Sequence, residues 1–217
     1  MAEQNKGMSD LWRRLRFVFM AIVIYRLGTH IPIPGIDPAR LAALFDQNQG
    51  TILEMFNLFS GGALERMSIF ALNVVPYISS AIIMQLFSNS IPYLQELKKD
   101  GQAGRNQITQ YTRYGTVLLA FVQASALAVT LGASGLAYEP GTSFFISAVF
   151  SVVAGTIFLM WLGEQISERG IGNGISIIIA TSILTGIPGA IGQALEQARQ
   201  GDLNILLLLG IGVLAML

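Results

Sequence analysis

Few side chains in this sequence are placed to perform covalent or metal chemistry. Cysteine is absent, which excludes thiol nucleophiles, disulfides and thiolate metal sites. His30 is the only histidine, and no HExxH motif or cluster with Asp and Glu surrounds it, so we expect a structural role. No Ser/His/Asp set, pair of carboxylates or P-loop stands out. The sequence therefore predicts no enzyme, no cofactor and no metal site.

A glycine-rich stretch at residues 170–174 has a superficial likeness to a phosphate-binding loop. Gly170, Gly172 and Gly174 alternate with other residues, but no strand precedes them and no Gly-Lys-Ser/Thr sequence follows, so the match is weak. A tight turn is the better interpretation, with Asn173 near the start of the next helix.

The composition indicates that lipid surrounds much of the chain. The 217 residues are 53% hydrophobic and only 12% charged, about half the charged fraction of a soluble domain. The net charge is zero, so charge gives no reason to expect a nucleic-acid partner. The polar N-terminus is followed by an apolar run without a small-residue cleavage site, so we expect no cleavable signal peptide.

Apolar runs of about 20 residues are long enough to cross a bilayer. The complete candidates are Leu15–Ile33, Leu72–Ile91, Gly115–Ser134, Ser143–Gly163 and Ile171–Ile191, and a sixth run begins at Leu203. That run is still apolar at Leu217, which favours a fragment of a longer protein because the last carbonyl groups would lack partners in hydrocarbon. We expect an all-α polytopic membrane protein with a cytoplasmic segment (1–14), five helices (15–202) and part of a sixth (203–217).

The distribution of lysine and arginine predicts that the N-terminus is cytoplasmic. With this orientation most basic residues fall on the inner side: Lys6, Arg13, Arg14, Arg16, Lys98, Lys99, Arg105, Arg113 and Arg169. The outer connection at residues 135–142 has none. The charged inner connection Leu94–Gly115 is either a solvated loop or a docking surface for a cytoplasmic partner.

The outer connection after the first span begins with prolines. Pro32 and Pro34 cannot donate backbone hydrogen bonds and predict the end of the first helix. A short surface helix then follows, with Asp37 as its cap, Pro38 in its first turn and Gly50 at its end.

Residues 59–87, FSGGALERMSIFALNVVPYISSAIIMQLF, place a short half-polar segment before a long apolar one. Gly61 and Gly62 permit a sharp turn, and Ser60 is a candidate cap. About ten residues from Ala63 to Leu72 would rise only about 15 Å as a helix, half of the bilayer core. Asn73 and Pro76 predict a kink before the long run.

Two interpretations of this short segment remain open from its residues alone. It is either an amphipathic helix on the outer surface or a half-helix inside a protein-lined cavity. The polar side chains of Glu65, Arg66 and Ser68 suit the second interpretation, because irregular backbone at membrane depth must be satisfied by protein or water.

Several residues within the spans are unusual for lipid. Arg26 lies near the outer end of the first span, where snorkelling or packing is expected. Gln85, Gln123 and Ser125 are expected to make hydrogen bonds between helices. The pairs Val74/Ile78 and Ile175/Ile179 each share a helix face, and by themselves they indicate only ordinary packing.

Four stretches together resemble one family: RLGTHIPIPGID, NLFSGGALERMSIFALNVVPYISSAII, QYTRYGT and MWLGEQISERGIGNGISIII. They are similar to the N-terminal half of SecY, the central subunit of the bacterial Sec protein-conducting channel. The resemblance covers about Leu11 to Leu217. It implies half of a ten-helix pore whose second helix is broken, the first part forming a plug on the outer side.

The resemblance also implies roles for particular residues. The plug falls on about residues 60–70, including Ser60, Gly61, Gly62, Leu64, Glu65, Arg66, Ser68 and Phe70. Val74 and Ile78, with Ile175 and Ile179, align with an apolar pore ring. Ser79 aligns with the lateral gate, where Gln85 and Gln123 are expected as polar neighbours.

A SecY-like function would be the translocation of unfolded secretory proteins, and the lateral insertion of membrane proteins, at the bacterial inner membrane. The implied partners are SecE, SecG, the SecA motor ATPase, the ribosome, signal peptides, unfolded substrate chains and lipid. The alternative is a secondary solute transporter with broken helices. Acidic residues within the spans would favour it, but Asp and Glu here lie in loops or at span ends.

Overall fold

The computed structural model describes residues 2–47, 60–139 and 141–200. The helices are α1 (Ala2–Gly28), α2 (Pro38–Gln47), α4 (Val75–Ser90), α5 (Pro92–Lys99), α6 (Gly101–Ala133), α7 (Thr142–Arg169) and α8 (Gly174–Gln200). Within these ranges the only extended pairing is two isolated antiparallel bridges, Pro32 with Ser68 and Ile36 with Ala137. The predicted all-α class is therefore confirmed. Gly50 and the sixth apolar run, 203–217, lie outside the described residues.

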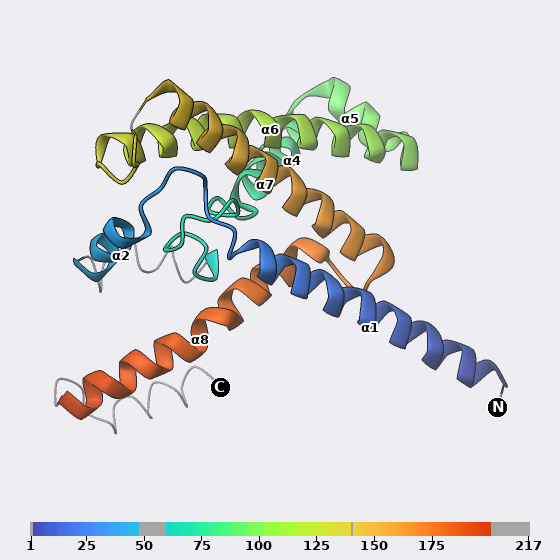
Figure 1. Ribbon diagram of the computed structural model, residues 1–217. Coiled ribbons are helices and arrows are strands. Elements are labelled where there is room, and N and C mark those ends of the chain that lie inside the picture. Colours follow the sequence, from blue (N-terminus) through green and yellow to red (C-terminus); the bar gives the residue numbers. More distant parts are fainter. Residues whose placement is uncertain (1, 48–59, 140, 201–217) are drawn as a thin grey trace.

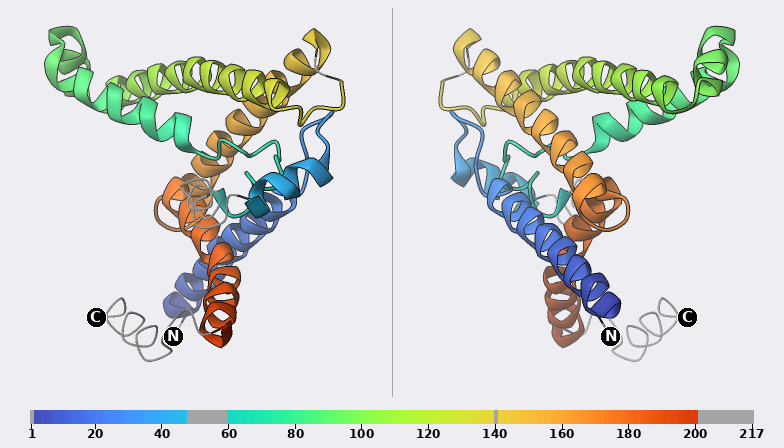
Figure 2. Two further views of the ribbon diagram at one scale, coloured as in Figure 1. Left: turned by 90° about the vertical axis from the view of Figure 1, so that its left-hand side faces the viewer. Right: turned by 90° about the vertical axis from the view of Figure 1, so that its right-hand side faces the viewer.

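Two helices, α6 and α7, are long and apolar enough to cross a membrane by length and composition, and the apolar part of α8, Gly174–Pro188, is shorter. The helices diverge from the middle of the molecule, where residues 60–74, here named the central segment, connect to α4. Figure 1 shows α6 crossing α7 on one side of this segment, with α1 and α8 extending away on the other. The rotated views show the same order (Figure 2).

Connections that the sequence places on the outer side lie together in the structure. The backbone N–H of Asp37 donates to the carbonyl of Leu136 at 2.9 Å, and Tyr138 N–H donates to Gly35 at 3.0 Å. At the opposite ends of the helices, the Arg14 guanidinium reaches the carbonyl of Gly170 at 3.4 Å. The connections that are predicted to share one side of the membrane therefore lie next to each other, as successive helices running in alternating directions require.

The end of the first helix differs from the predicted run, whereas the start of the second agrees with the prediction. The first helix ends at Gly28, before Ile33, because the prolines that follow cannot continue it. Asp37 caps α2 as predicted, its Oδ1 accepting hydrogen bonds from the N–H groups of Ala39 at 2.9 Å and Arg40 at 3.4 Å.

The expectation of a loop over Leu94–Gly115 is wrong. Residues 92–99 form α5, and α6 begins at Gly101. Leu94 and Leu97 are buried on one face of α5, so an apolar stripe three residues apart stabilises this helix against its neighbours. Pro92 stands in its first turn, where the missing N–H costs nothing.

Candidate functional site

The central segment is buried but is not the short helix that the sequence predicts. Residues 61–74 form successive turns, and Met67 and Asn73 have positive φ angles of 40° and 49°. Such angles interrupt a right-handed helix, so the predicted helix over Ala63–Leu72 is wrong. The predicted kink is also wrong in form: α4 begins at Val75, with Pro76 in its first turn.

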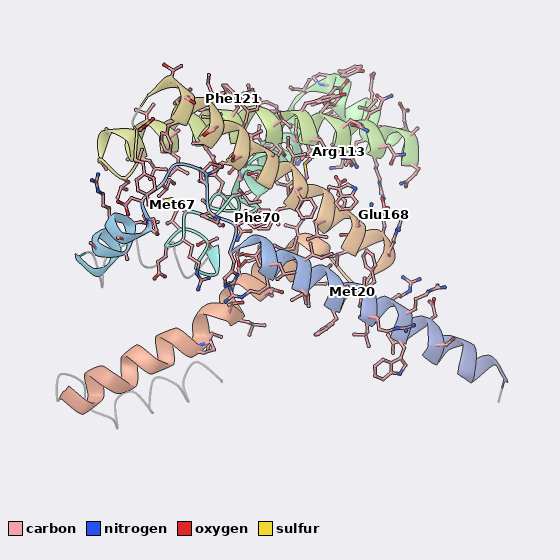
Figure 3. All side chains as sticks on the ribbon, viewed as in Figure 1. Met20, Met67, Phe70, Arg113, Phe121 and Glu168 are labelled. Carbon is pink, nitrogen blue, oxygen red and sulfur yellow. The ribbon has the colours of Figure 1, made fainter. Side chains whose placement is uncertain are left out.

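Side chains of the central segment point mostly into protein. Ala63, Ser68 and Phe70 are 0%, 0% and 2% exposed, whereas Glu65 and Arg66 are exposed. The segment therefore lies inside a protein-lined space, as the second interpretation requires, and its exposed side chains are those of Glu65 and Arg66. Figure 3 places Met67 and Phe70 in the middle of the molecule, away from Met20 on α1 and Phe121 on α6.

Two glycines let the central segment approach its neighbouring helices closely. A Cβ atom on Gly155 of α7 would collide with the carbonyl oxygen of Ile69, and one on Gly28 of α1 would collide with the Phe70 ring. The Phe70 ring stacks between Tyr25 and Phe158, with ring centroids 6.0 Å and 5.9 Å away. The absence of side chains at Gly28 and Gly155 thus leaves the space that the Phe70 ring occupies.

A short backbone pairing fixes the second half of the central segment. Ile33 N–H donates to the Met67 carbonyl at 2.8 Å, and Ile69 N–H donates to the Ile31 carbonyl at 3.0 Å. The chain after α1 and the central segment therefore run antiparallel at this point.

The four residues expected to form the apolar ring lie in one apolar cluster. Val74 is 2% exposed, and the partly buried side chains of Ile78, Ile175 and Ile179 pack against the same cluster. Val74 stands at the start of α4 and the two later isoleucines on α8, so the structure brings together pairs that are about 100 residues apart in sequence.

Beside this apolar cluster lies a buried set of polar groups that the sequence did not single out. Tyr25 Oη lies 2.6 Å from Ser182 Oγ and 3.4 Å from the carbonyl of Ser60. Asn73 Nδ2 donates to Ser182 Oγ at 3.1 Å. Ser182 follows Ile179 by three residues and so lies near the same face of α8. This spacing is the sequence feature that places Ser182 close to the apolar ring.

Arg26 packs against the central segment. Its Nη1 donates to the carbonyl of Gly61 at 3.1 Å, which supports the packing interpretation. His30 Nδ1 lies 2.8 Å from the carbonyl of Arg26, in keeping with a structural role. The described residues contain no group of three or more His, Cys, Asp or Glu side chains that would hold a metal ion.

The three residues expected at the lateral gate lie on two helices and differ in exposure. Ser79 is half-buried on α4 and Gln123 half-buried on α6. Gln85 is exposed and lines a groove of about 400 Å³ between α4, α5 and α6.

Ser80, next to Ser79 on α4, makes a hydrogen bond between α4 and α6. The hydroxyl of Ser80 donates to the Thr112 carbonyl of α6 at 2.8 Å. The expectation for Ser125 is wrong, because its hydroxyl donates within α6 to Phe121 at 2.7 Å.

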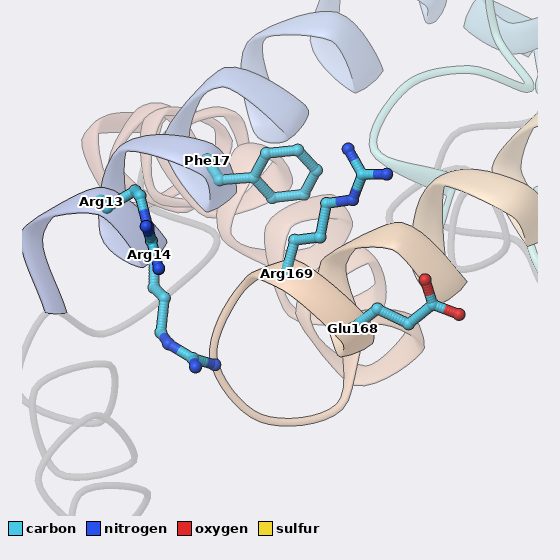
Figure 4. Close-up of a pocket in the computed structure, with 5 residues that line it drawn as sticks. All are labelled: Arg13, Arg14, Phe17, Glu168 and Arg169. Carbon is cyan, nitrogen blue, oxygen red and sulfur yellow. The ribbon is translucent and has the colours of Figure 1, made fainter. Parts of the chain in front are cut away.

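A second cleft of about 400 Å³ lies at the predicted cytoplasmic end, lined by Arg13, Arg14, Phe17, Glu168 and Arg169. The guanidinium groups of Arg14 and Arg169 point away from each other (Figure 4). Asp10 also pairs with Arg13 and Arg14, and the hydrogen bond from Arg14 lowers the pKa of this carboxyl below its ordinary value. The cleft therefore has no convergent anion site.

Two helices are also joined by a strong ion pair. Arg113 of α6 donates two hydrogen bonds of 2.8 Å, from Nε and Nη2, to the carboxylate of Glu164 on α7. This fork geometry fixes the crossing of the two helices at their predicted cytoplasmic ends.

Fold and site together define a polytopic helical membrane protein built around a buried, irregular segment and an adjoining apolar cluster. The chain belongs to the SecY family, whose family model matches residues 68–217. The resemblance seen in the four motifs is thereby confirmed.

Relatives support the same family over a longer stretch. The chain is 61% identical over 214 residues to a protein translocase subunit SecY of Pseudomonas aeruginosa, covering 99% of this chain and 48% of that protein. It is 57% identical over 212 residues to the SecY of Escherichia coli, covering 96% and 48%. The chain thus spans about half the length of these curated relatives.

Solved structures support the fold alone. A chain described as Sec61 in the canine ribosome-channel complex from the endoplasmic reticulum matches with a TM-score of 0.61 at 20% identity, covering 90% of this chain and 43% of that one. A structure described as a protein-conducting channel gives the same values.

Proposed function

We propose that this chain is the N-terminal half of the pore-forming subunit of a Sec-type protein-conducting channel. The observation that carries the proposal is the central segment, buried next to the cluster that contains Val74, Ile78, Ile175 and Ile179. The relatives, which are named protein translocase subunit SecY, support it. The substrates are unfolded secretory chains and the signal peptides that lead them.

Residues 60–70 act as the plug and the four branched apolar side chains as half of a pore ring. Such a ring contacts a passing chain without preference for its sequence, and it dewets when empty, which resists ion leakage. No bond is made or broken by this chain. The driving energy comes from a partner, either the SecA motor ATPase or a translating ribosome.

The remaining assignments follow from the same proposal. Ser79, Gln85 and Gln123 belong to the first wall of a lateral gate that releases apolar segments into lipid. SecE and SecG surround the complete subunit in the bacterial inner membrane. The N-terminus lies in the cytoplasm, in agreement with the positions of most lysines and arginines.

Deleting residues 60–70 from the full-length subunit tests the proposal. Purified complexes are placed in planar bilayers, and ion conductance is recorded without substrate. We expect the deletion to raise the conductance several-fold over the unaltered complex, because water and ions enter an unplugged pore.

A control variant, Tyr138→Ala, alters an outer side chain that is 64% exposed and should leave conductance unchanged. A deletion variant that assembles and stays as tightly closed as the unaltered complex would contradict the proposal.

A further inference from the structure

The Ser182 hydroxyl is the centre of a polar contact inside an otherwise apolar region. Ser182 is 0% exposed. Its Oγ donates to the Ile178 carbonyl of its own helix at 2.9 Å, which leaves its lone pairs to accept from Asn73 Nδ2 at 3.1 Å and from Tyr25 Oη at 2.6 Å. Three elements, α1, α8 and the end of the central segment, thus meet at one oxygen atom.

The same contact includes the beginning of the central segment. Tyr25 Oη lies 3.4 Å from the Ser60 carbonyl, and a Cβ atom on Gly61 would lie 3.1 Å from the Cα atom of Ser182. The next residue of α1, Arg26, donates to the Gly61 carbonyl. Both ends of residues 60–74 are therefore fastened at the junction of α1 and α8.

The contact also lies next to the apolar ring. Asn73 directly precedes Val74, and Ser182 follows Ile179 by less than one turn of α8. The bond from Asn73 to Ser182 consequently joins the α4 side of the ring to the α8 side. Separation of the two sides requires this bond to break.

Breaking such bonds is unfavourable in a dry interior and easier in a wet one. A buried donor or acceptor without a partner loses its full solvation free energy, whereas water replaces the partner at little net cost. While apolar side chains exclude water, Tyr25, Asn73 and Ser182 bond to one another, and the carbonyl groups of Ile178 and Ser60 lie within reach of the two hydroxyls. Water that entered the pore would solvate the same groups and remove most of the free-energy cost of separating them.

We propose that Tyr25, Asn73 and Ser182 form a polar latch that holds the central segment closed and couples its release to wetting of the pore. This inference rests on the proposed function and adds a regulatory device to it. The latch sets the fraction of time that an idle channel is open, and it leaves the width of the open pore unchanged.

Three variants that each remove one polar group test the latch. Tyr25→Phe and Ser182→Ala delete only a hydroxyl, and Asn73→Gly deletes the amide while allowing the positive φ angle of 49°. They are introduced into the full-length subunit, and single-channel currents of the reconstituted complex are recorded without substrate. We expect each to raise the open fraction about two- to tenfold, with the single-channel conductance unchanged.

Two comparisons make the result specific. The double variant of Tyr25 and Ser182 should open little more than the larger single variant, because both changes break one shared contact. Thr181→Val is the matched control: this half-buried hydroxyl of α8 donates only to Ile177 of its own helix, at 2.8 Å, and its removal should not alter the open fraction.

The outcomes separate the latch from the proposed function. If deletion of residues 60–70 raises conductance while the three assembled variants keep the unaltered open fraction, the latch is wrong and the plug assignment stands. An equal rise in Thr181→Val also overturns the latch, because a general loosening of α8 then explains the data. If the deletion itself has no effect, the proposed function fails and the latch fails with it.

Discussion

At the scale of single residues, the half-buried side chain of Ile78 is the most direct test of the apolar ring. It packs against the cluster that contains Val74, one turn further along α4. We predict that Ile78→Asp makes the resting pore leaky, with at least a several-fold higher conductance, because a carboxylate holds water where branched carbons exclude it.

Single-channel recording of the full-length complex provides the measurement for Ile78→Asp. Ile82→Asp serves as its control, since Ile82 lies on the same helix with 53% of its surface exposed and should affect insertion more than leakage. A tight seal in Ile78→Asp would argue against a ring role for this residue.

How far residues can be assigned from sequence depends on whether the signal is local. Asp37 and Asn173 were predicted near helix starts, and each accepts hydrogen bonds from the first turn of its helix. Ser182 and Tyr25 were not singled out, because a serine or tyrosine in an apolar run acquires its partner only from another helix. Ser80, which bonds to Thr112, was missed for the same reason.

At the scale of elements, contact between α7 and the central segment depends on Gly155. A methyl group there would overlap the Ile69 carbonyl, which belongs to backbone and cannot rotate away. We predict that Gly155→Ala lowers the free energy of unfolding of the full-length complex by about 1–3 kcal/mol, the usual penalty for overpacking, and also raises ion leakage.

Gly132→Ala is the matched control for this substitution, because it lies in α6 with open space around its Cβ position. It should instead stabilise by about 0.5–1 kcal/mol, since alanine is the better helix former. Thermal unfolding of the purified complexes compares the two. Equal shifts in the same direction would show that the close approach of Ile69 does not matter.

The crossing of α6 and α7 should depend on the ion pair between Arg113 and Glu164. The two side chains are 35% and 19% exposed, so solvent weakens the pair only in part. We predict that Arg113→Ala lowers the free energy of unfolding by about 1–2 kcal/mol, and that Arg113→Lys recovers only part of this loss because lysine cannot form the two-bond fork.

A double-mutant cycle with Glu164→Gln isolates the interaction of this pair. Arg105→Ala removes an exposed arginine two turns earlier on α6 and is expected to change stability by less than about 0.5 kcal/mol. If Arg105→Ala and Arg113→Ala destabilise equally, the pair does not fix the helix crossing.

The elements themselves were predictable to different degrees. The long apolar runs correctly predicted that the later helices exist, because a run of about 20 apolar residues is typical of a helix that spans a membrane. The prediction of a helix in the central segment is wrong. Its residues have acceptable helix propensity, but backbone pairing with residues 31–33 determines its conformation. Tertiary contacts decide such a segment, and a sequence without those contacts does not reveal it.

At the scale of the whole molecule, this chain has large apolar surfaces that its own described residues do not cover. Leu27 on α1, Leu118 on α6 and Leu184 on α8 are 66%, 66% and 64% exposed. Lipid and protein contacts beyond this chain are expected to cover these faces, because the chain spans about half the length of its relatives. Figure 2 shows that the helices diverge from the middle of the molecule.

The topology of the chain leads to a prediction about which connections face each side of the membrane. This segment has no cysteine, so single cysteines introduced into a full-length protein cleared of any others report their own location. We predict that Tyr138→Cys, at an exposed position in the connection between α6 and α7, reacts in intact cells with a maleimide that cannot cross the membrane. Gln102→Cys, at an exposed position at the start of α6, should react only after the membrane is opened.

Ile171→Cys adds a second connection that is predicted to lie on the same side of the membrane as Gln102. It lies in the turn between α7 and α8 with 39% of its surface exposed, and it should behave like Gln102→Cys if α6 and α7 both cross the membrane and so return the chain to the side on which α6 begins. Reaction of Gln102→Cys and Ile171→Cys, but not Tyr138→Cys, in intact cells would mean the reverse orientation. If Gln102→Cys and Ile171→Cys instead differed from each other, α6 and α7 would not both cross the membrane.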